Sequence, residues 1–185
     1  MLKIIQAPHP VLSKKAKSIE KIDAAIKRLI DEMAKTLENA KDPEGVGLAA
    51  PQVGKSLRLF IVKESNSAPL RVFINPEVKI INSEEKLKTK QTKKKSQEIK
   101  LEGCLSLKDI WGVVKRHDKI EVSYLDEKGE KHTEIFKGFI ATIIQHEQDH
   151  LEGILFPQRV LEQNGTIYKS KINKKGEMEF HEISI

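Results

Sequence analysis

Long apolar runs are missing from this sequence of 185 residues. No stretch approaches the roughly 20 consecutive apolar residues that a membrane-spanning helix requires. The first five residues, MLKII, lack the long apolar core of a secretory signal peptide, and they are not the arginine- and serine-rich type of a transit peptide. We therefore expect a protein that works in the cytoplasm and does not bind membranes.

Cysteine is nearly absent as well, since Cys104 is the only one in the chain. A single cysteine excludes an internal disulfide framework and fits a reducing compartment. Taken alone, such a residue is more often a small buried hydrophobic side chain than a reactive one. Aromatic residues are few, at 5%, but a hydrophobic fraction of 38% over this length is enough for one domain with its own core. We expect residues 1–185 to form that single domain.

Most of the net charge of +6 is concentrated in one segment. Residues 82–100 hold seven lysines against three glutamates, so the rest of the chain carries only +2. Within this segment, residues 86–95 contain six lysines and no acidic residue. We predict that residues 82–100 are a lysine-rich, solvated insertion loop. Because the basicity is local, it does not indicate specific nucleic-acid binding by the domain as a whole.

The pattern of apolar residues predicts an α+β fold. Across residues 23–40 they recur at helical spacing, Asp23 can cap the start of this helix, and Pro43 lies beyond its end. Runs rich in branched residues predict strands at 57–62, 70–74, 78–81, 97–101, 113–116, 119–125 and 131–136. The tail at residues 161–185 resembles a β-hairpin, with strands predicted at 166–172 and 177–183. We expect antiparallel sheets packed around a helix that carries the functional residues.

That helix is predicted from residues 145–151, which read QHEQDHL. Residues four apart lie on one face of a helix, so His146 and His150 can both reach one metal ion. Residues 138–144 supply apolar side chains for the helix, and Gly153 is a natural stop. A glutamate directly after the first histidine is typical of zinc sites with a built-in general base. Strings of this kind also occur on solvated helix faces, and two imidazoles bind a catalytic metal poorly without a third ligand.

Two other segments contain residues suited to chemistry. Residues 102–106 read EGCLS and include the only cysteine, which could supply the third ligand. Residues 45–52 read GVGLAAPQ, and glycines allow the backbone to approach another group closely. A phosphate site is disfavoured here, because no Lys-Ser/Thr pair follows and no strand directly precedes the glycines. The second segment is therefore either a loop that lies against a substrate or a packing turn.

Together, segments 45–52, 102–106 and 145–151 resemble the three signature motifs of the peptide deformylase family, in the family's order. The resemblance runs from the region of residues 8–10 to about Val160. It implies one catalytic domain with antiparallel sheets around a central metal-bearing helix. The implied reaction is metal-dependent hydrolysis of the N-formyl group from the N-terminal formyl-methionine of newly synthesised proteins, with release of formate. The implied partners are N-formyl-methionyl nascent polypeptides.

By this resemblance, Cys104, His146 and His150 ligate one metal ion. Three protein ligands with an open fourth position are typical of a catalytic site rather than a structural one. Family members use Fe²⁺, which Zn²⁺ or Ni²⁺ can replace, although a thiolate with two imidazoles would by itself indicate zinc first. Glu147, which is not a ligand, would take a proton from water and later pass one to the departing amine.

The resemblance also assigns residues around the metal. The side-chain amide of Gln52 and the backbone N–H of Leu105 would donate to the developing oxyanion. Gly45 and Gly47 would flank the substrate backbone. An apolar slot for the methionine side chain is expected nearby, and its candidate residues are Val46, Phe139 and Ile143. Ordinary core packing is the alternative role for these three residues, and both roles can hold at once.

Some positions differ from the family's pattern. Many members carry an arginine that helps to hold the peptide where this sequence has Trp111, and an Ile/Val-Pro pair after the cysteine motif is also missing. Arg116 is still available to pair with Glu102. Glu102 and Gln145 are expected to hold the metal ligands in place.

Two other functions remain to be separated from this one. A zincin-like metalloendopeptidase would need a third ligand after the helix, for which Glu162 is the only serious candidate, and it would leave Cys104 without a role. A basic module that docks on the ribosome or on nucleic acid would depend on the lysines at 86–95. The same lysines could instead give an enzyme a transient contact with the ribosome.

Overall fold

The computed structural model describes residues 1–40, 45–65, 67–81, 101–173 and 175–183. The lysine-rich segment 82–100 lies outside these residues, and so does most of the strand predicted at 97–101. Leu101 itself is described and belongs to no strand.

Among the described residues, one antiparallel sheet has five strands, of which the first, Gly47–Ala49, was not predicted. The predicted strands at 57–62, 119–125 and 131–136 are confirmed. Neighbouring strands in this sheet follow the order β1 (Gly47–Ala49), β2 (Leu59–Val62), β3 (Arg71–Ile80), β6 (Lys119–Leu125) and β7 (Lys131–Lys137). Strands β6 and β7 pair in register over their full length, from Lys119↔Lys137 to Leu125↔Lys131.

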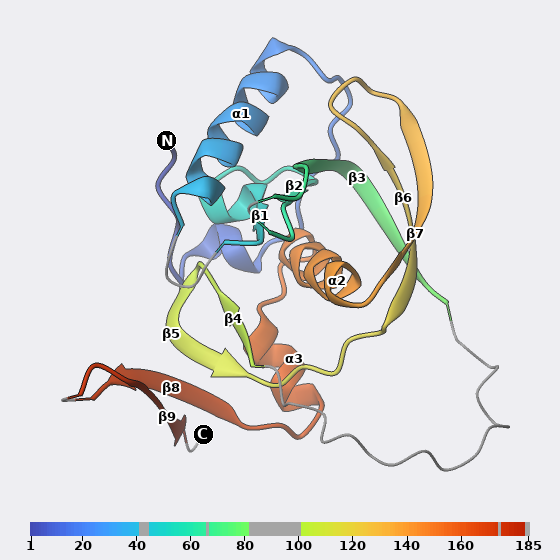
Figure 1. The fold of residues 1–185 in the computed structure, drawn as a ribbon. Helices are drawn as coiled ribbons and strands as arrows, with labels where there is room; N and C mark the ends of the chain where they lie inside the picture. Colours follow the sequence, from blue (N-terminus) through green and yellow to red (C-terminus); the bar gives the residue numbers. More distant parts are fainter. Residues whose placement is uncertain (41–44, 66, 82–100, 174, 184–185) are drawn as a thin grey trace, which may run out of the picture.

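A second antiparallel sheet has four strands and lies below the first in Figure 1. Its order is β4 (Glu102–Cys104), β5 (Leu107–Gly112), β8 (Ile167–Ile172) and β9 (Met178–Ile183). Strands β8 and β9 form a hairpin, whose register runs from Ile167↔Ile183 to Ile172↔Met178. The cysteine segment is thus joined through β5 to the C-terminal hairpin.

Helix α2 (Phe139–Leu151) is the predicted histidine helix, and it lies at the centre of the molecule, between the two sheets (Figure 1). It ends just before Gly153, whose φ of 74° favours glycine. A Cβ at Gly153 would also lie 2.8 Å from the backbone of Ser13. The predicted stop therefore has two physical reasons, and the expectation of a central helix between antiparallel sheets is confirmed.

The described residues also form two further helices and two short 3₁₀ turns. Helix α1 (Ala24–Glu38) matches the prediction, and the side chain of Asp23 accepts hydrogen bonds from the N–H groups of Ala25 and Ile26. The other elements are η1 (Pro10–Ser13), η2 (Ala50–Val53) and α3 (Phe156–Glu162).

The core lies on both faces of the five-stranded sheet. All four residues of β2 are buried, because alternate side chains point to opposite faces and both faces are covered. Phe60 and Val62 belong to the cluster that also contains buried residues of α2, whereas Leu59 and Ile61 belong to the cluster with α1. The sheet therefore fixes α2 from one side, while α1 covers the other.

The strands predicted at 70–74 and 78–81 are a single strand, β3, with an irregularity between Ile74 and Glu77. Asn75 has a φ of 48°, and its side chain binds both the N–H and the C=O of Ile19, at 2.8 Å each. Pro76 cannot donate to the ladder, so the strand bends here but continues on the other side.

The strand predicted at 113–116 is wrong. The strand in this region is β5, and residues 113–118 have no regular structure. Two side-chain amides, rather than a neighbouring strand, bind the backbone of this segment. Gln163 accepts from the N–H of Lys115 at 2.7 Å, and Gln145 accepts from the N–H of His117 at 3.0 Å. The segment between β5 and β6 is therefore held by α3 and α2.

Helix α3 was not predicted, although its sequence contains a start signal. Pro157 lies in the first turn, where its missing N–H costs nothing, and Phe156 and Val160 are buried at i and i+4. Its length of 7 residues is too short for a clear periodic pattern.

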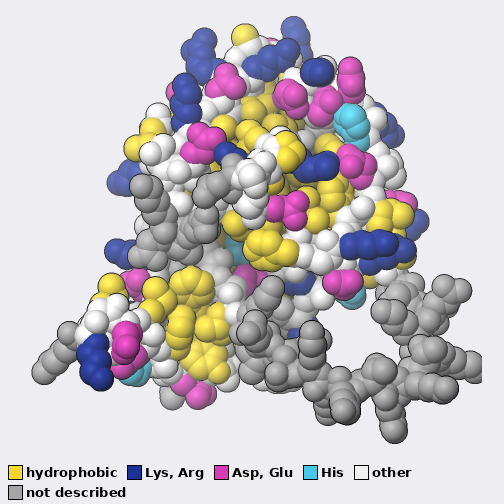
Figure 2. All heavy atoms as spheres, in the orientation of Figure 1, with side chains coloured by type: hydrophobic (Ala, Val, Ile, Leu, Met, Phe, Trp, Pro, Cys, Tyr) yellow, Lys and Arg dark blue, Asp and Glu magenta, His cyan; other side chains and the backbone are white. Residues whose placement is uncertain are grey.

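No helix among the described residues is long and apolar enough to cross a membrane. Hydrophobic side chains do gather on one part of the surface, at the lower left of Figure 2, over β5 and the C-terminal hairpin. Exposed apolar residues of the hairpin include Ile172, Met178 and Phe180.

Candidate metal centre

Cys104, His146 and His150 come together from two elements that are far apart in the sequence. Cys104 ends β4, while both histidines project from α2, and one ligand atom of each residue lies within 4.8 Å of the others. The Sγ of Cys104 is 3.2 Å from the Nε2 of His150. Tetrahedral zinc-type coordination gives a separation of about 3.5 Å between sulfur and nitrogen ligands. These three residues therefore fit a divalent metal ion.

The ring of His146 is oriented by Glu102. Its Nδ1 lies 2.7 Å from Oε1 of Glu102. Burial alone would raise the pKa of Glu102, but hydrogen bonds and charges from His146 and Arg116 lower it to about 2. The carboxylate is therefore ionised and accepts, so Nδ1 carries the hydrogen and Nε2 is left for the metal.

The surroundings shift the pKa values of the two histidines in opposite directions. Burial lowers the pKa of His150 well below its usual value, and the charge of His146 adds to this effect. For His146, burial is outweighed by hydrogen bonds to Cys104 and Glu102, which raise its pKa well above the usual value. A metal ion must displace the proton from the nitrogen it binds, so we expect metal binding to release protons.

Glu147 lies beside the ligands and makes no hydrogen bond through Oε2 to any described residue. Its side chain is buried, and burial raises the pKa of Glu147 to about 7. Position 47 leaves room for this carboxylate: a Cβ on Gly47 would lie 2.8 Å from the Cδ of Glu147. A buried carboxyl that is half protonated near neutral pH can both accept and return a proton.

Gln52 has a fixed amide orientation at the same site. Its Oε1 accepts from the N–H of Ala49 at 2.8 Å, and its Nε2 donates to the Sγ of Cys104 at 3.4 Å. The side chain is buried at the end of η2. Leu105 follows Cys104, and its carbonyl accepts from Nε2 of Gln6 at 2.9 Å. The Gln52 amide thus has a defined orientation near the cysteine. The bond from Gln6 holds the peptide group that follows Leu105, not the one that carries the Leu105 N–H.

The two glycines of segment 45–52 contact different neighbours. A Cβ at Gly45 would lie 2.7 Å from Cδ1 of Leu37 on α1, so this position is a packing turn. Gly47 instead begins β1 and faces Glu147. Of the two roles left open for this segment, close packing within the protein therefore has direct support.

The three candidates for the apolar slot lie in different surroundings. Ile143 is buried, and Val46 packs against the same cluster of residues. Phe139 is the first residue of α2 and is 51% exposed, so it lies at the outer end of the face that carries the ligands.

Trp111 lies directly against the cysteine strand. A Cβ on Gly103 would be 2.7 Å from Cζ3 of Trp111, so the ring occupies the space above this glycine. Its Nε1 donates to Ser170 of β8 at 3.0 Å, and its ring meets Phe180 of β9 edge-on, with centroids 5.8 Å apart. At this position the C-terminal hairpin packs beside the metal centre.

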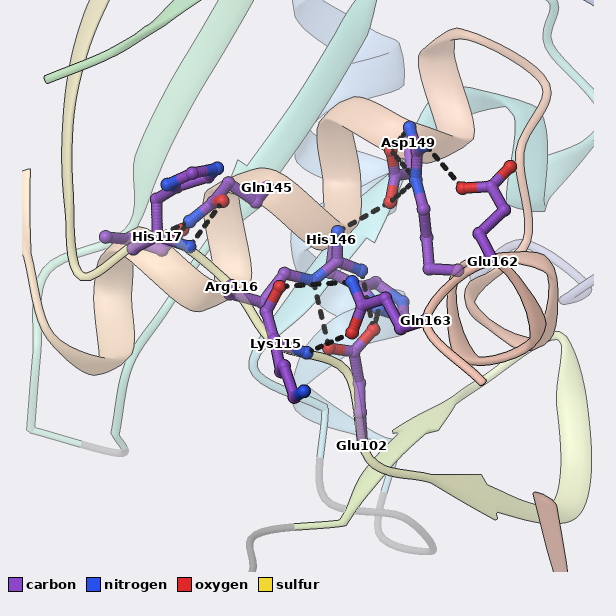
Figure 3. Close-up of polar contacts among 11 residues, drawn as sticks. Glu102, Lys115, Arg116, His117, Gln145, His146, Asp149, Glu162 and Gln163 are labelled. Atoms are coloured by element: carbon purple, nitrogen blue, oxygen red, sulfur yellow. Dashed lines mark hydrogen bonds and ion pairs between the residues drawn. The ribbon is translucent and has the colours of Figure 1, made fainter. Parts of the chain in front are cut away.

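Arg116 binds Glu102 as the sequence suggested. Nε and Nη2 of the arginine donate to the two carboxylate oxygens, at 3.1 and 2.7 Å, and Nη1 donates to Asp149 at 2.6 Å (Figure 3). Asp149 and Arg159 were not predicted as part of the site. Asp149 lies inside the histidine segment, but its partner Arg159 belongs to α3, which was not predicted.

Two residues considered in the sequence analysis, Gln145 and Glu162, have partners other than the metal ligands. Within the described part of the chain, Gln145 makes no hydrogen bond to a metal ligand. Its amide binds the backbone of His117 (Figure 3) and the carbonyl of Ala141. It therefore holds the segment that carries Arg116. Glu162, the third ligand that an endopeptidase would need, is paired with Arg159 at 3.0 Å and is absent from the metal-binding group.

The described residues contain one other group that could hold an ion, formed by Asp126, Glu130 and His132. It lies at the β6–β7 turn, where Asp126 already accepts from the N–H groups of Lys128 and Glu130. This arrangement is explained by the turn itself.

Comparison with known proteins agrees with the geometry. A family model described as polypeptide deformylase matches residues 1–165. The chain is 42% identical over 147 residues to a peptide deformylase from Pseudothermotoga lettingae, covering 80% of this chain and 75% of that protein. It is 35% identical over 178 residues to one from Desulfotalea psychrophila, covering 94% and 96%. The crystal structure of peptide deformylase from Thermotoga maritima is similar with a TM-score of 0.71 at 37% identity, covering 86% of this chain and 97% of that one.

Proposed function

Because this chain belongs to the polypeptide deformylase family, we propose that Cys104, His146 and His150 hold its metal ion and that Glu147 is its general base. The protein is a metal-dependent hydrolase that removes the N-formyl group from the N-terminal formyl-methionine of newly synthesised polypeptides and releases formate. One observation carries the residue assignment: a cysteine and two histidines converge beside a buried glutamate with an unpartnered oxygen.

When bound by these three residues, a divalent ion would polarise the formyl carbonyl and lower the pKa of a water molecule. Glu147 accepts the proton of the attacking water. The same carboxyl then returns a proton to the amine nitrogen as its bond to the formyl carbon breaks. The raised pKa of Glu147, about 7, supports both steps, because it brings the two protonation states close in free energy near neutral pH.

Gln52 and Leu105 stabilise the oxyanion. The carbonyl end of the Gln52 amide is bound to Ala49, so its NH₂ group faces the site. The backbone N–H of Leu105, directly after Cys104 in the chain, is the second donor. Loss of one such donor reduces turnover by roughly 100- to 1000-fold.

The substrate lies along the glycine segment. The peptide groups of Gly45 and Gly47 flank its backbone, while the Cα of Gly45 packs against Leu37 of α1. Val46, Ile143 and Phe139 line the slot for the methionine side chain. The shared cluster of Val46 and Ile143 supports an apolar slot next to α2, with Phe139 at its exposed end.

Formate release separates this function from its alternatives. We expect the metal-loaded protein to release stoichiometric formate from formyl-Met-Ala-Ser and to leave casein undigested. Casein cleavage without formate release would instead support an endopeptidase. Absence of both activities in protein that holds a full equivalent of metal would contradict the enzymatic assignment.

The metal is Fe²⁺ in this proposal, and Zn²⁺ or Ni²⁺ can replace it. A thiolate and two imidazoles accept all three ions, so the preference for iron rests on the family rather than on the ligands. Metal analysis after purification without oxygen should find iron, and this form should be the most active and should decay in air. A zinc form of equal activity would contradict the preference.

The site of action is the cytoplasm, near the ribosome, with the whole chain acting as one catalytic domain. The lysines at 86–95 lie outside the described residues, so a transient ribosome contact rests on their sequence alone. Such a contact should weaken steeply with salt as phosphate counterions are released. Deleting residues 86–95 should then reduce co-sedimentation with ribosomes at low salt and leave short-peptide turnover unchanged.

A further inference from the structure

A chain of alternating charges connects the metal centre to α3. It begins at His146, whose Nδ1 is bound to Glu102, and continues through the guanidinium of Arg116 to Asp149 (Figure 3). Asp149 in turn accepts from Arg159: its Oδ1 lies 2.8 Å from Nη2 and 3.2 Å from Nε of the arginine. The inner members are buried, with side-chain exposures of 8% for Arg116, 10% for Asp149 and 12% for Glu102.

Arg116 is shared between two carboxylates at opposite ends of its fork. It binds Glu102 through Nε and Nη2, and it binds Asp149 through Nη1. Asp149 immediately precedes His150 on α2, whereas Glu102 lies on β4, so one guanidinium joins the two elements that supply all three metal ligands. The guanidinium is planar and its N–H groups point in fixed directions, so each nitrogen can donate to only one carboxylate oxygen.

We propose that Arg159 is a positioning residue for the metal centre, acting through Asp149, Arg116 and Glu102 on His146. This inference rests on the proposed role of Cys104, His146 and His150 as ligands. It makes α3, which contributes no ligand, a part of the metal site.

Each carboxylate of the cluster has a cationic partner: Glu102 is paired with Arg116, and Asp149 is paired with Arg159. Glu102 and Asp149 would otherwise compete for the single charge of Arg116. Arg159 supplies Asp149 with a cation of its own, so Arg116 can keep both of its bonds to Glu102. Without Arg159, Arg116 is the remaining cationic partner of Asp149, and it is drawn toward Asp149 and away from Glu102. Glu102 then fixes the ring of His146 less well, and a ligand with a loose orientation binds metal more weakly.

Metal affinity tests this directly, without reference to turnover. Arg159→Gln should weaken the binding of Zn²⁺ or Co²⁺ by about 10-fold or more, measured by competition with a chromophoric chelator. Arg159→Lys, which keeps the charge and loses the fork, should fall between this variant and wild type. Glu162→Gln is the matched control: it removes the outer partner of Arg159, at 3.0 Å, and should change affinity less than twofold.

A double-mutant cycle tests whether Arg159 acts through Glu102. In a Glu102→Gln background, Arg159→Gln should produce little further loss of metal affinity, because the connection to His146 is already broken. The visible absorption bands of the Co²⁺ form report ligand geometry, and Arg159→Gln should shift or broaden them. A residue that only stabilised the fold would lower the melting temperature of the metal-free protein and leave these bands unchanged.

Two results would overturn the proposal: equal affinities and spectra for wild type and Arg159→Gln, or additive losses in the double mutant. Arg159 is 32% exposed on a surface helix, so these variants are expected to fold. A wild-type protein that bound no metal at Cys104, His146 and His150 would instead contradict the proposed ligand set itself, and the two failures can therefore be told apart.

Discussion

The absence of a side chain at Gly47 leaves the space that the carboxylate of Glu147 occupies. These residues are 100 positions apart in the sequence, yet a Cβ at position 47 would lie 2.8 Å from Cδ and 2.9 Å from Cγ of the glutamate. The atoms that this Cβ would meet form the end of the Glu147 side chain, which is buried on α2, so a side chain at position 47 would have to displace the carboxylate. The glycine segment therefore sets the position of the proposed base.

Replacing this glycine tests that relationship. Gly47→Ala should displace the Glu147 carboxylate and reduce kcat for a formyl-Met peptide by about 100-fold, since small misplacements of a reacting group have effects of this size. The metal ligands are untouched, so metal content should stay at one equivalent. The contrasting variant is Gly45→Ala, whose Cβ would meet Leu37 on α1 at 2.7 Å.

For Gly45→Ala we expect the main loss in stability, seen as a lower melting temperature, with Glu147 left in place. If Gly47→Ala retained kcat while Gly45→Ala lost it, the space at position 47 would not be what positions the base.

The single thiol of the chain reports whether Cys104 binds the metal. As a metal-bound thiolate it should react slowly with a disulfide reagent, and it should react quickly and stoichiometrically once a chelator has removed the ion. The chelated protein should also melt at a lower temperature, because an ion that binds only the native state stabilises it. Equal reaction rates with and without chelator would remove Cys104 from the metal site.

The raised pKa of Glu147 predicts a pH-dependent stability in metal-free protein. Between its ordinary value of 4.5 and its folded value of about 7, the native state holds a proton that the unfolded state has released. The native state thus binds more protons, so this contribution to the free energy of unfolding is fully present below pH 4.5 and is lost as the pH rises through about 7.

Glu147→Gln removes the titration and serves as the reference. The difference in unfolding free energy between wild type and this variant should decrease with rising pH in chelated protein, by at most about 3 kcal/mol in total. Urea unfolding at several pH values from 4.5 to 8 measures it. A difference that stayed constant with pH would show that Glu147 titrates normally.

The sequence predicts the elements whose side chains repeat regularly and whose ends carry specific residues. Helix α2 has histidines four residues apart after an apolar run and a glycine at its end, and β6 alternates buried with partly exposed residues along its length. The resemblance of three segments to the motifs of one family predicts the group of Cys104, His146 and His150, and the fold brings these residues together.

Contacts between distant segments could not be predicted in this way. Strand β5 pairs with β8, with Ile110 opposite Lys169, and Asp109 has a φ of 62°, so neither its partner nor its backbone follows a local pattern. Residues 113–116 look like a strand because of two adjacent valines, but glutamine side chains from α2 and α3 bind this segment instead. The pairing of Asp149 with Arg159 depends on α3, and this helix is too short for its apolar residues to show a helical period.

The most direct test of the central claim compares formate release by wild type and Glu147→Ala at equal metal content. Glu147 is assigned as base and not as ligand, so the variant should bind a full equivalent of metal and release formate from formyl-Met-Ala-Ser at less than a few per cent of the wild-type rate, consistent with a loss of roughly 100-fold or more. A metal-loaded variant that kept substantial turnover, or a variant that lost its metal, would contradict the assignment.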